Sequence, residues 1–299
     1  MTDDRYRMLR LPESLRLDVR GVSQHCTRWA GRRGAPDAPP VLLLHGYLDC
    51  GATFQFLADA LEPSRALLAP DWRGFGDSAW SAQGYWFPDY FADLEAIIDR
   101  VAPGQAIDVV GHSMGGNIAM MYAGIRPERV RRLVSLEGFG LPGGTPDRAP
   151  GRYREWLDQW RTPPAASVFP SLAAFTAVLR KRDPRLSPER ADFVARAWCE
   201  LLPDGSVRPR FDPAHKRVNP VLYRREEAAA CWAAIRAPVL YVAGAQSEFL
   251  ARLQGDGDPA RMRQWVPQLE PRVVEDAGHM LHHHQPAAVA RLIEEFLAD

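Results

Sequence analysis

The sequence is short of lysine and has no excess of charge of either sign. Lysine stands only at positions 181 and 216, so arginine carries almost all of the positive charge. Lys and Arg together number 37, as do Asp and Glu, and the formal net charge is zero at pH 7. A neutral chain has no overall electric field that would attract nucleic acid or an anionic membrane. We therefore expect no nucleic-acid partner and a small, roughly neutral substrate.

Cysteine and long apolar segments are also scarce. The four cysteines show neither a C-x-x-C pair nor a dense disulfide framework, which favours reduced thiols in a cytosol and argues against zinc. No run approaches the ~18 apolar residues of a membrane span, and Met1 to Arg5 lack the basic start of a signal peptide. We expect no membrane span, no cofactor and a cytoplasmic location. The sequence does not indicate whether the protein is a monomer or an oligomer. The cysteines are Cys26, Cys50, Cys199 and Cys231.

Hydrophobic periodicity is what the sequence does have. Of the 299 residues 46% are hydrophobic, enough for a large buried core. Residues 14–30 alternate apolar and polar side chains around Gly21, which is typical of an antiparallel hairpin. Short apolar strands then alternate with amphipathic helices, so a parallel, doubly wound sheet is predicted. The expected strands are 41–44, 66–69, 107–110 and 130–136, and the expected helices are 51–62, 88–102 and 114–125.

The alternation of short strands and helices stops between residues 138 and 236. Repeated prolines interrupt the segment, and its recognisable pieces at 153–161, 171–181 and 188–201 have helical patterns. A strand at 238–244, another at 272–275 and a final helix at 286–298 then resume the earlier pattern. We predict a core domain of residues 1–137 and 237–299, with residues 138–236 inserted as a helical cap.

The strongest chemical motif is Gly111-His112-Ser113-Met114-Gly115-Gly116. It stands where an apolar strand ends and a helix begins, the setting that a G-x-S-x-G nucleophile elbow requires. In such a turn the serine hydroxyl is exposed at the carboxyl edge of the sheet, and the next backbone amide is free to bind an oxyanion. Ser113 is therefore the candidate nucleophile.

Together with this motif, three other stretches make the sequence resemble the α/β-hydrolase superfamily over nearly its whole length. They are His45-Gly46-Tyr47-Leu48-Asp49, residues 71–78 (DWRGFGDS), and Gly278-His279 followed by Pro286. The stretch 45–54 is most similar to serine hydrolase-like proteins. The resemblance implies an α/β-hydrolase fold and an oxyanion hole made by the amides of Tyr47 and Met114. For the His45 side chain we expect a structural role in its turn.

The base is expected from the late stretch 278–286, which holds four histidines. His279 follows Gly278 as the base does in the family, whereas His284 falls where many relatives carry an acidic residue. Three adjacent histidines also suggest a metal, but side chains at i, i+1 and i+2 of a helix do not converge on one ion. We therefore predict His279 as the base and no metal site.

Two carboxylates compete for the role of the acid. In most relatives it lies in a G-x-x-D turn after the cap, where this sequence has Gly244-Ala245-Gln246-Ser247-Glu248, with serine at the expected position. Other relatives, including certain haloalkane dehalogenases, carry the acid at the end of the strand before the cap, where Glu137 stands. A carboxylate there is costly to bury without a partner, which favours Glu137 over Glu248. Both remain candidates.

A serine nucleophile favours hydrolysis of a small carboxylic ester or related acyl compound through an acyl-enzyme. Carbon–carbon bond hydrolysis, lyase or perhydrolase chemistry on the same fold, and a non-catalytic binding protein, are the alternatives. Aromatic residues before and within the cap predict an entrance for an apolar or aromatic ester, although they equally suit packing of the cap on the core. They are Trp80, Tyr85, Trp86, Phe87, Tyr153, Trp156, Trp160, Phe169 and Phe175.

Overall fold

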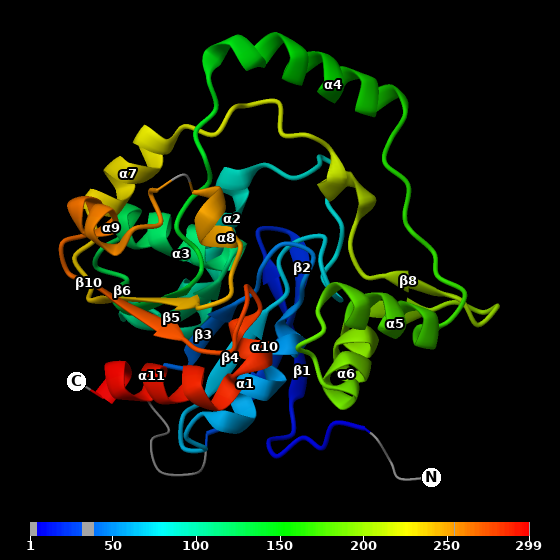
Figure 1. Ribbon diagram of the computed structural model, residues 1–299, viewed down its shortest axis with the longest axis horizontal. Helices are drawn as coiled ribbons and strands as arrows, with labels where there is room; N and C mark the ends of the chain where they lie inside the picture. Colours follow the sequence, from blue (N-terminus) through cyan, green and yellow to red (C-terminus); the bar gives the residue numbers. More distant parts are fainter. Residues whose placement is uncertain (1–4, 32–38, 254, 299) are drawn as a thin grey trace.

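A computed structural model describes residues 5–31, 39–253 and 255–298, so most of the stretch Met1 to Arg5, which lacks the features of a signal peptide, lies outside the described residues. Within these residues eight strands form one sheet in the order β1-β2-β4-β3-β5-β6-β9-β10 (Figure 1). The strands are β1 (Glu13–Val19), β2 (Val22–Trp29), β3 (Val41–Leu44), β4 (Leu67–Pro70), β5 (Ile107–His112), β6 (Val130–Leu136), β9 (Val239–Gly244) and β10 (Leu269–Val274).

Strand direction follows the predicted pattern. β1 and β2 form an antiparallel hairpin that turns at Arg20 and Gly21, both at positive φ, and β2 pairs antiparallel with β4. All the other neighbours in the sheet are parallel. The structure thus confirms a mostly parallel sheet with N-terminal antiparallel edge strands.

Helices cover both faces of the sheet, because consecutive residues of a strand point to opposite sides. Leu43 and Val110 pack in one core with α1 and α11, whereas Leu42 and Val109 pack in the other with α2 and α3. The predicted helix 51–62 is divided into a 3-10 turn, η1, and the shorter α1. The bounds are η1 (Gly51–Phe54), α1 (Gln55–Ala60), α2 (Phe87–Val101), α3 (Met114–Ile125), α8 (Phe249–Arg252), α9 (Pro259–Trp265), α10 (Leu281–His284) and α11 (Pro286–Ala298).

Residues 138–236 connect β6 to β9, two adjacent strands, and contain more than the three helices predicted. The helix expected at 188–201 ends at Trp198, and β7 then pairs with β8 in a small hairpin. α7 packs against α3 of the core. The division into core and cap remains a prediction. The elements are η2 (Pro146–Arg148), α4 (Ala149–Arg161), α5 (Leu172–Arg182), α6 (Pro188–Trp198), β7 (Cys199–Leu201), β8 (Val207–Pro209), η3 (Pro213–Lys216) and α7 (Arg225–Ala233).

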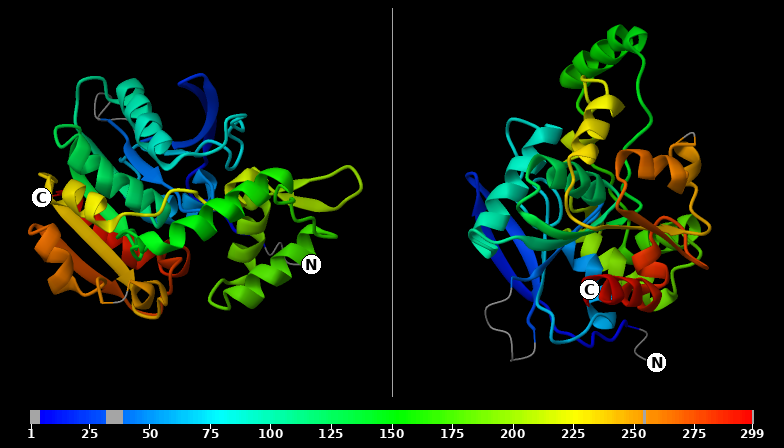
Figure 2. Two further views of the ribbon diagram at one scale, coloured as in Figure 1. Left: turned by 90° about the horizontal axis from the view of Figure 1, so that it is seen from above. Right: turned by 90° about the vertical axis from the view of Figure 1, so that its left-hand side faces the viewer.

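α4 stands apart from the sheet and is reached by extended segments on both sides (Figure 2). None of its residues is buried, and Tyr153, Leu157 and Trp160 are largely exposed. On the side of α5 and α6, by contrast, Phe175 and Val194 pack in a separate cluster with Phe56 of the core helix α1. The inserted segment therefore has one part packed on the core and one part that extends into solvent.

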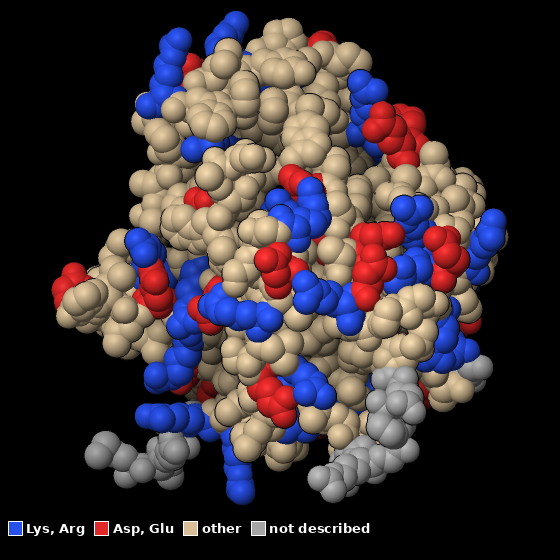
Figure 3. All heavy atoms as spheres, turned by 180° about the vertical axis from the view of Figure 1, so that it is seen from behind, with Lys and Arg blue, Asp and Glu red and all other residues tan. Residues whose placement is uncertain are grey.

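Charged side chains of both signs are interspersed on the face shown in Figure 3. Ion pairs among the described residues include Arg65 with Glu294 and Arg131 with Asp108. No helix in the described ranges combines the length and apolar character needed to cross a membrane.

Candidate active site

Ser113 occupies a sharp turn between β5 and α3. Its backbone angles are φ 52° and ψ −113°, a combination that L-residues adopt only when the surrounding structure imposes it. The turn needs glycine nearby, because a Cβ at Gly115 would lie 2.1 Å from the carbonyl oxygen of Leu44. Ser113 is only partly buried. The backbone therefore makes the sharp turn expected of the elbow, and Ser113 is not fully enclosed.

His279 lies on the loop between β10 and α10, opposite this serine. Its Nε2 is 3.0 Å from Ser113 Oγ. Two contacts orient the ring and its loop: Phe249 stacks on the imidazole at 4.9 Å between ring centroids, and His112 Nε2 is 2.9 Å from the His279 carbonyl oxygen. Of the four histidines in the stretch 278–286, His279 is the one at hydrogen-bond distance from Ser113.

The carboxylate that contacts His279 is Glu137, at the end of β6. Its Oε2 is 2.7 Å from His279 Nδ1, and the side chain is fully buried. Oε1 accepts a hydrogen bond from the Gly244 amide at 2.8 Å, and Oε2 also accepts one from Ser247 Oγ at 2.6 Å. Glu248 is exposed. Ser247, the serine in the turn after β9, thus shares Glu137 Oε2 with His279.

Glu137 itself has a left-handed backbone, with φ 56°. Its amide donates to Val242 O on the neighbouring strand, and the turn that follows is closed by Ser135 Oγ, which donates to Gly138 O at 2.7 Å. If Glu137 had the backbone angles of a β-strand, the chain would continue in the direction of β6. Its left-handed backbone instead turns the chain at the edge of the sheet where Ser113 lies. Residues with strained backbones, such as Ser113 and Glu137, are concentrated at functional sites.

The turn after β3 passes directly over the serine. A Cβ at Gly46 would lie 3.2 Å from Ser113 Cβ, so the backbone of the residue before Tyr47 passes close to the serine. Met114 begins α3, and the first N–H groups of a helix have no partner within the helix. Both amides predicted for the oxyanion hole therefore belong to segments that border Ser113. The Tyr47 hydroxyl points elsewhere and donates to His215 O.

His45 holds two loops together. Its Nε2 accepts a hydrogen bond from the Trp72 amide at 2.9 Å, and its Nδ1 is 2.8 Å from Gly46 O. Burial lowers the pKa of this histidine, so the ring is neutral. Asp71 likewise braces its loop by accepting from the Gly51 and Asp77 amides. Both side chains hold the loops that surround the site rather than facing Ser113.

A second polar group lies beneath this site. Asp49, His282 and His283 are buried, and a ligand atom of each lies within 4.8 Å of those of the other two. Burial raises the pKa of Asp49 and lowers the pKa of both histidines. The fourth histidine of the stretch, His284, instead pairs with Asp183 at 2.5 Å.

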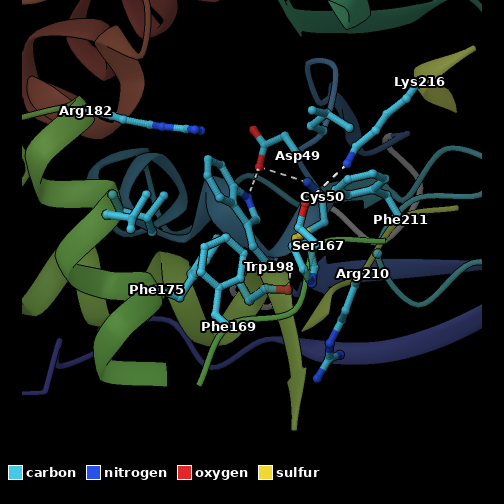
Figure 4. A pocket seen from close by; sticks show the side chains of 16 residues that line it. Asp49, Cys50, Ser167, Phe169, Phe175, Arg182, Trp198, Arg210, Phe211 and Lys216 are labelled. Atoms are coloured by element: carbon cyan, nitrogen blue, oxygen red, sulfur yellow. Dashed lines mark hydrogen bonds between the residues drawn. The ribbon is translucent and has the colours of Figure 1, made fainter. Parts of the chain in front are cut away.

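A cavity of about 300 Å³ opens beside the residues that follow Tyr47 (Figure 4). Leu48 and Asp49 form its inner wall, and aromatic residues from the inserted segment, among them Phe175, Trp198 and Phe211, surround it. Arg182, Arg210 and Lys216 add positive charge to its lining. Of the aromatic residues expected at an entrance, Phe169 and Phe175 line this cavity, whereas four others are 43–52% exposed, namely Trp80, Trp86, Tyr153 and Trp160.

Comparison with known proteins agrees with this geometry. A sequence model of the family described as "alpha/beta hydrolase fold" matches residues 39–286. The chain belongs to this family. It is a hydrolase by family, and its predicted fold class is confirmed.

Individual α/β hydrolases resemble the chain over most of its length. It is 27% identical to a "Serine hydrolase-like protein" of Danio rerio over 281 residues, which cover 90% of this chain and 86% of the relative. It is 28% identical to a 2-hydroxymuconate semialdehyde hydrolase of Pseudomonas sp., with 87% of each chain covered. The solved "Thioesterase Domain From Curacin Biosynthetic Pathway" superposes with a TM-score of 0.81 at 26% identity, covering 95% of this chain and 99% of that one.

Sequence reasoning missed two features of this α/β hydrolase's site. The supporting role of Ser247 was not foreseen, although the serine was noticed at the position of the missing acid. The approach of Asp49 to His282 and His283 was not foreseen either, because only the three adjacent histidines were considered as a set. No spacing in the sequence signals that contact, since 233 residues separate Asp49 from His282.

Proposed function

We propose that this α/β hydrolase cleaves small carboxylic esters, or related acyl compounds, through an acyl-enzyme on Ser113. The observation that carries the proposal is the continuous chain of hydrogen-bond contacts from Ser113 Oγ to His279 Nε2 and from His279 Nδ1 to Glu137 Oε2, at 3.0 and 2.7 Å. A nucleophile in contact with a base, itself oriented by a third group, is the signature of covalent acyl transfer.

The reaction follows from these contacts. His279 Nε2 takes the proton of Ser113 Oγ as the oxygen attacks the ester carbonyl carbon. The amides of Tyr47 and Met114 donate to the oxyanion that forms, each contributing about 3 kcal/mol. When the bond to the alcohol oxygen breaks, His279 returns the proton to the leaving alcohol. Water, deprotonated by the same imidazole, then attacks the acyl carbon; as the bond to Ser113 Oγ breaks, His279 returns this proton to the serine oxygen and the carboxylic acid is released.

Glu137 has two tasks in this cycle. Its carboxylate accepts from Nδ1–H, which leaves Nε2 free to take the serine proton, and its negative charge stabilises the imidazolium that results. Burial makes the second task effective, because little water screens the charge. The donors Gly244 N–H and Ser247 Oγ–H satisfy the remaining acceptor capacity, so the ionised carboxylate is tolerated in the core.

The substrate we infer is an apolar or aromatic ester of modest size. The cavity near the site has a volume of about 300 Å³, and Leu48, directly after the proposed oxyanion donor Tyr47, is part of its wall. Phe175 and Phe211 give it apolar surfaces that suit an alkyl or aryl group. All four cysteines are free thiols, which agrees with the cytoplasmic location that we infer.

Carbon–carbon bond hydrolysis is the second candidate. The 28% identity to a 2-hydroxymuconate semialdehyde hydrolase favours considering it, since similar sites in this fold serve different reactions. The Ser113, His279 and Glu137 group would be used in both reactions, so only the substrate distinguishes them.

Turnover of p-nitrophenyl esters of graded acyl length tests the proposal. We expect the wild-type protein to hydrolyse short or aromatic acyl esters, and Ser113→Ala to lose at least about 10⁴-fold in kcat/KM. Ser64→Ala, at an exposed serine, is the matched control and should behave as wild type. No ester cleavage combined with cleavage of a carbon–carbon bond next to a ketone would favour the second candidate. A wild-type protein that a fluorophosphonate fails to label would favour a non-catalytic binding protein.

A further inference from the structure

The buried group formed by Asp49, His282 and His283 has no use in the proposed ester hydrolysis. Asp49 ends the segment that carries Tyr47, whereas the two histidines lie on α10, directly after His279. All three side chains are at least 96% buried, and their ligand atoms lie within 4.8 Å of one another.

Only one of the two carboxylate oxygens of Asp49 accepts hydrogen bonds. Its Oδ1 accepts from the Cys50 amide, Thr53 Oγ1 and Trp198 Nε1, at 2.8, 2.7 and 2.7 Å. Figure 4 shows two of these bonds on one oxygen of the carboxylate. Its Oδ2 is buried and has no partner within the described ranges of the chain. Burying an ionised carboxylate oxygen without a partner costs several kcal/mol, so the ionised form of Asp49 needs a donor or a cation at Oδ2.

The two imidazoles are also unpartnered. Both ring nitrogens of His282 and both of His283 are buried without a hydrogen bond to any described residue. Arg190 approaches α10, but its guanidinium donates to the carbonyl oxygens of His283 and His284. In the described part of the chain, no salt bridge neutralises Asp49. Five buried ligand atoms, four nitrogens and one carboxylate oxygen, therefore remain unsatisfied in one small region.

We propose that Asp49 Oδ2, His282 and His283 form a binding site for one divalent transition-metal ion, with Zn²⁺ as the best-matched ion. Imidazole nitrogen and carboxylate oxygen are zinc ligands at about 2.0–2.2 Å from the ion. Two ligands on one tetrahedral ion lie about 3.4 Å apart, so small side-chain rotations from separations of up to 4.8 Å complete the site. The ion supplies the positive charge that Asp49 lacks and binds one unpaired nitrogen of each imidazole.

The position of the site gives the ion a role. Asp49 is also among the residues that line the cavity of about 300 Å³, so one ligand residue of the site borders this cavity. Bound metal joins the segment carrying Tyr47 to the helix that follows His279, and therefore stiffens two parts of the site at once. Helix geometry argued against three adjacent histidines as a metal site. In this short helix, however, the rings of His282 and His283 lie 4.2 Å apart between centroids, and Asp49 supplies the third ligand from another segment.

Metal binding by the chelator-treated protein tests the proposal directly, without an activity assay. We expect one Zn²⁺ per chain by calorimetry, visible absorption bands of a low-coordinate site with Co²⁺, and a metal-dependent rise in Tm. His282→Gln and His283→Gln should each weaken Zn²⁺ binding by about 100-fold or more, at least the loss seen when an outer partner of a ligand is removed. His284→Gln is the matched control, since this neighbouring ring is engaged by Asp183 and the Gly278 amide, and its Zn²⁺ affinity should equal that of wild type.

Asp49→Asn separates binding from folding. With its amide nitrogen at the Oδ2 position, the asparagine keeps the three hydrogen bonds made to Oδ1, so the metal-free variant should unfold at a temperature no lower than wild type. It should nevertheless lose the Tm rise with Zn²⁺. The proposal is overturned if wild type binds no Zn²⁺ or Co²⁺, in which case water satisfies these atoms. It is also overturned if His284→Gln weakens binding as much as His283→Gln, or if Asp49→Asn retains wild-type affinity.

Discussion

Glu137→Gln is the substitution that isolates the contribution of the proposed acid. The two side chains have the same shape, so the effect arises from replacing one acceptor oxygen by an N–H₂ donor. The Gly244 amide hydrogen points at Oε1, and a buried donor facing another donor costs about 1–3 kcal/mol. The glutamine will therefore keep its oxygen on Gly244 and turn its amide nitrogen toward Ser247 and His279.

This orientation changes the tautomer of the base. The Ser247 hydroxyl can rotate to accept, but His279 Nδ1 must lose its hydrogen to accept from the amide, and Nε2 then carries the proton. An Nε2–H cannot take the proton of Ser113. We expect kcat to fall by about 10⁴-fold, a loss of about 5.5 kcal/mol of transition-state stabilisation, with KM little changed.

Steady-state kinetics with the best p-nitrophenyl ester measure this loss, and thermal unfolding verifies that the variant is folded. Glu248→Gln is the matched control: it makes the same chemical change at the exposed competing carboxylate and should leave kcat unaltered. Retention of more than about a tenth of wild-type kcat by folded Glu137→Gln would refute the reasoning, because a wrong tautomer permits no such rate. A large loss in Glu248→Gln would assign the acid to Glu248 instead.

Three further substitutions test the surroundings of the serine. Gly46→Ala places a Cβ 3.2 Å from Ser113 Cβ and displaces the oxyanion turn, so kcat/KM for the ester should fall about 100-fold; wild-type kinetics would contradict this placement. Tyr47→Phe leaves the backbone amide in place, and its kcat should stay within about threefold of wild type; a larger loss would assign the phenol a direct role. His25→Gln removes the hydrogen bond with Asp71 that raises the pKa of His25. The stabilisation from that raised pKa is complete below about pH 6.5 and is lost as the pH rises through the folded-state pKa, so the difference in unfolding free energy between wild type and variant should shrink as the pH rises above about 6.5 in denaturant titrations. If the difference in unfolding free energy grew as the pH rose, the stabilising role of the His25–Asp71 hydrogen bond would be contradicted.

Local periodicity was sufficient for the regular core. The strand at 41–44 and the helices at 114–125 and 286–298 have the predicted bounds, because each is a buried run or an amphipathic repeat between clear turn signals. The small β7–β8 hairpin was not predicted, since three-residue strands are too short for a recognisable period. The Asp204-Gly205 pair in its turn was the available signal.

The site residues also fall into those that a local motif identifies and those that only the tertiary structure identifies. Ser113 and His279 stand in local motifs whose settings identify them as candidates, whereas the choice between Glu137 and Glu248 depends on which strand end faces the imidazole. That is a property of the sheet, in which β6 lies beside β9 and brings Glu137 to Gly244 and Ser247. The approach of Asp49 to α10 likewise depends on tertiary packing, so no linear pattern reveals it.

The central claim is that Ser113 becomes covalently acylated during turnover. Rapid acid quenching of the wild-type protein with an activated acetyl ester, followed by peptide mapping by mass spectrometry, tests it directly. Our account predicts one acetyl group on the peptide that contains Ser113, fragment ions that assign it to that serine, and no acetylated peptide in Ser113→Ala. Ester turnover with the acetyl group on another residue, or an equally acetylated and active Ser113→Ala, would contradict it.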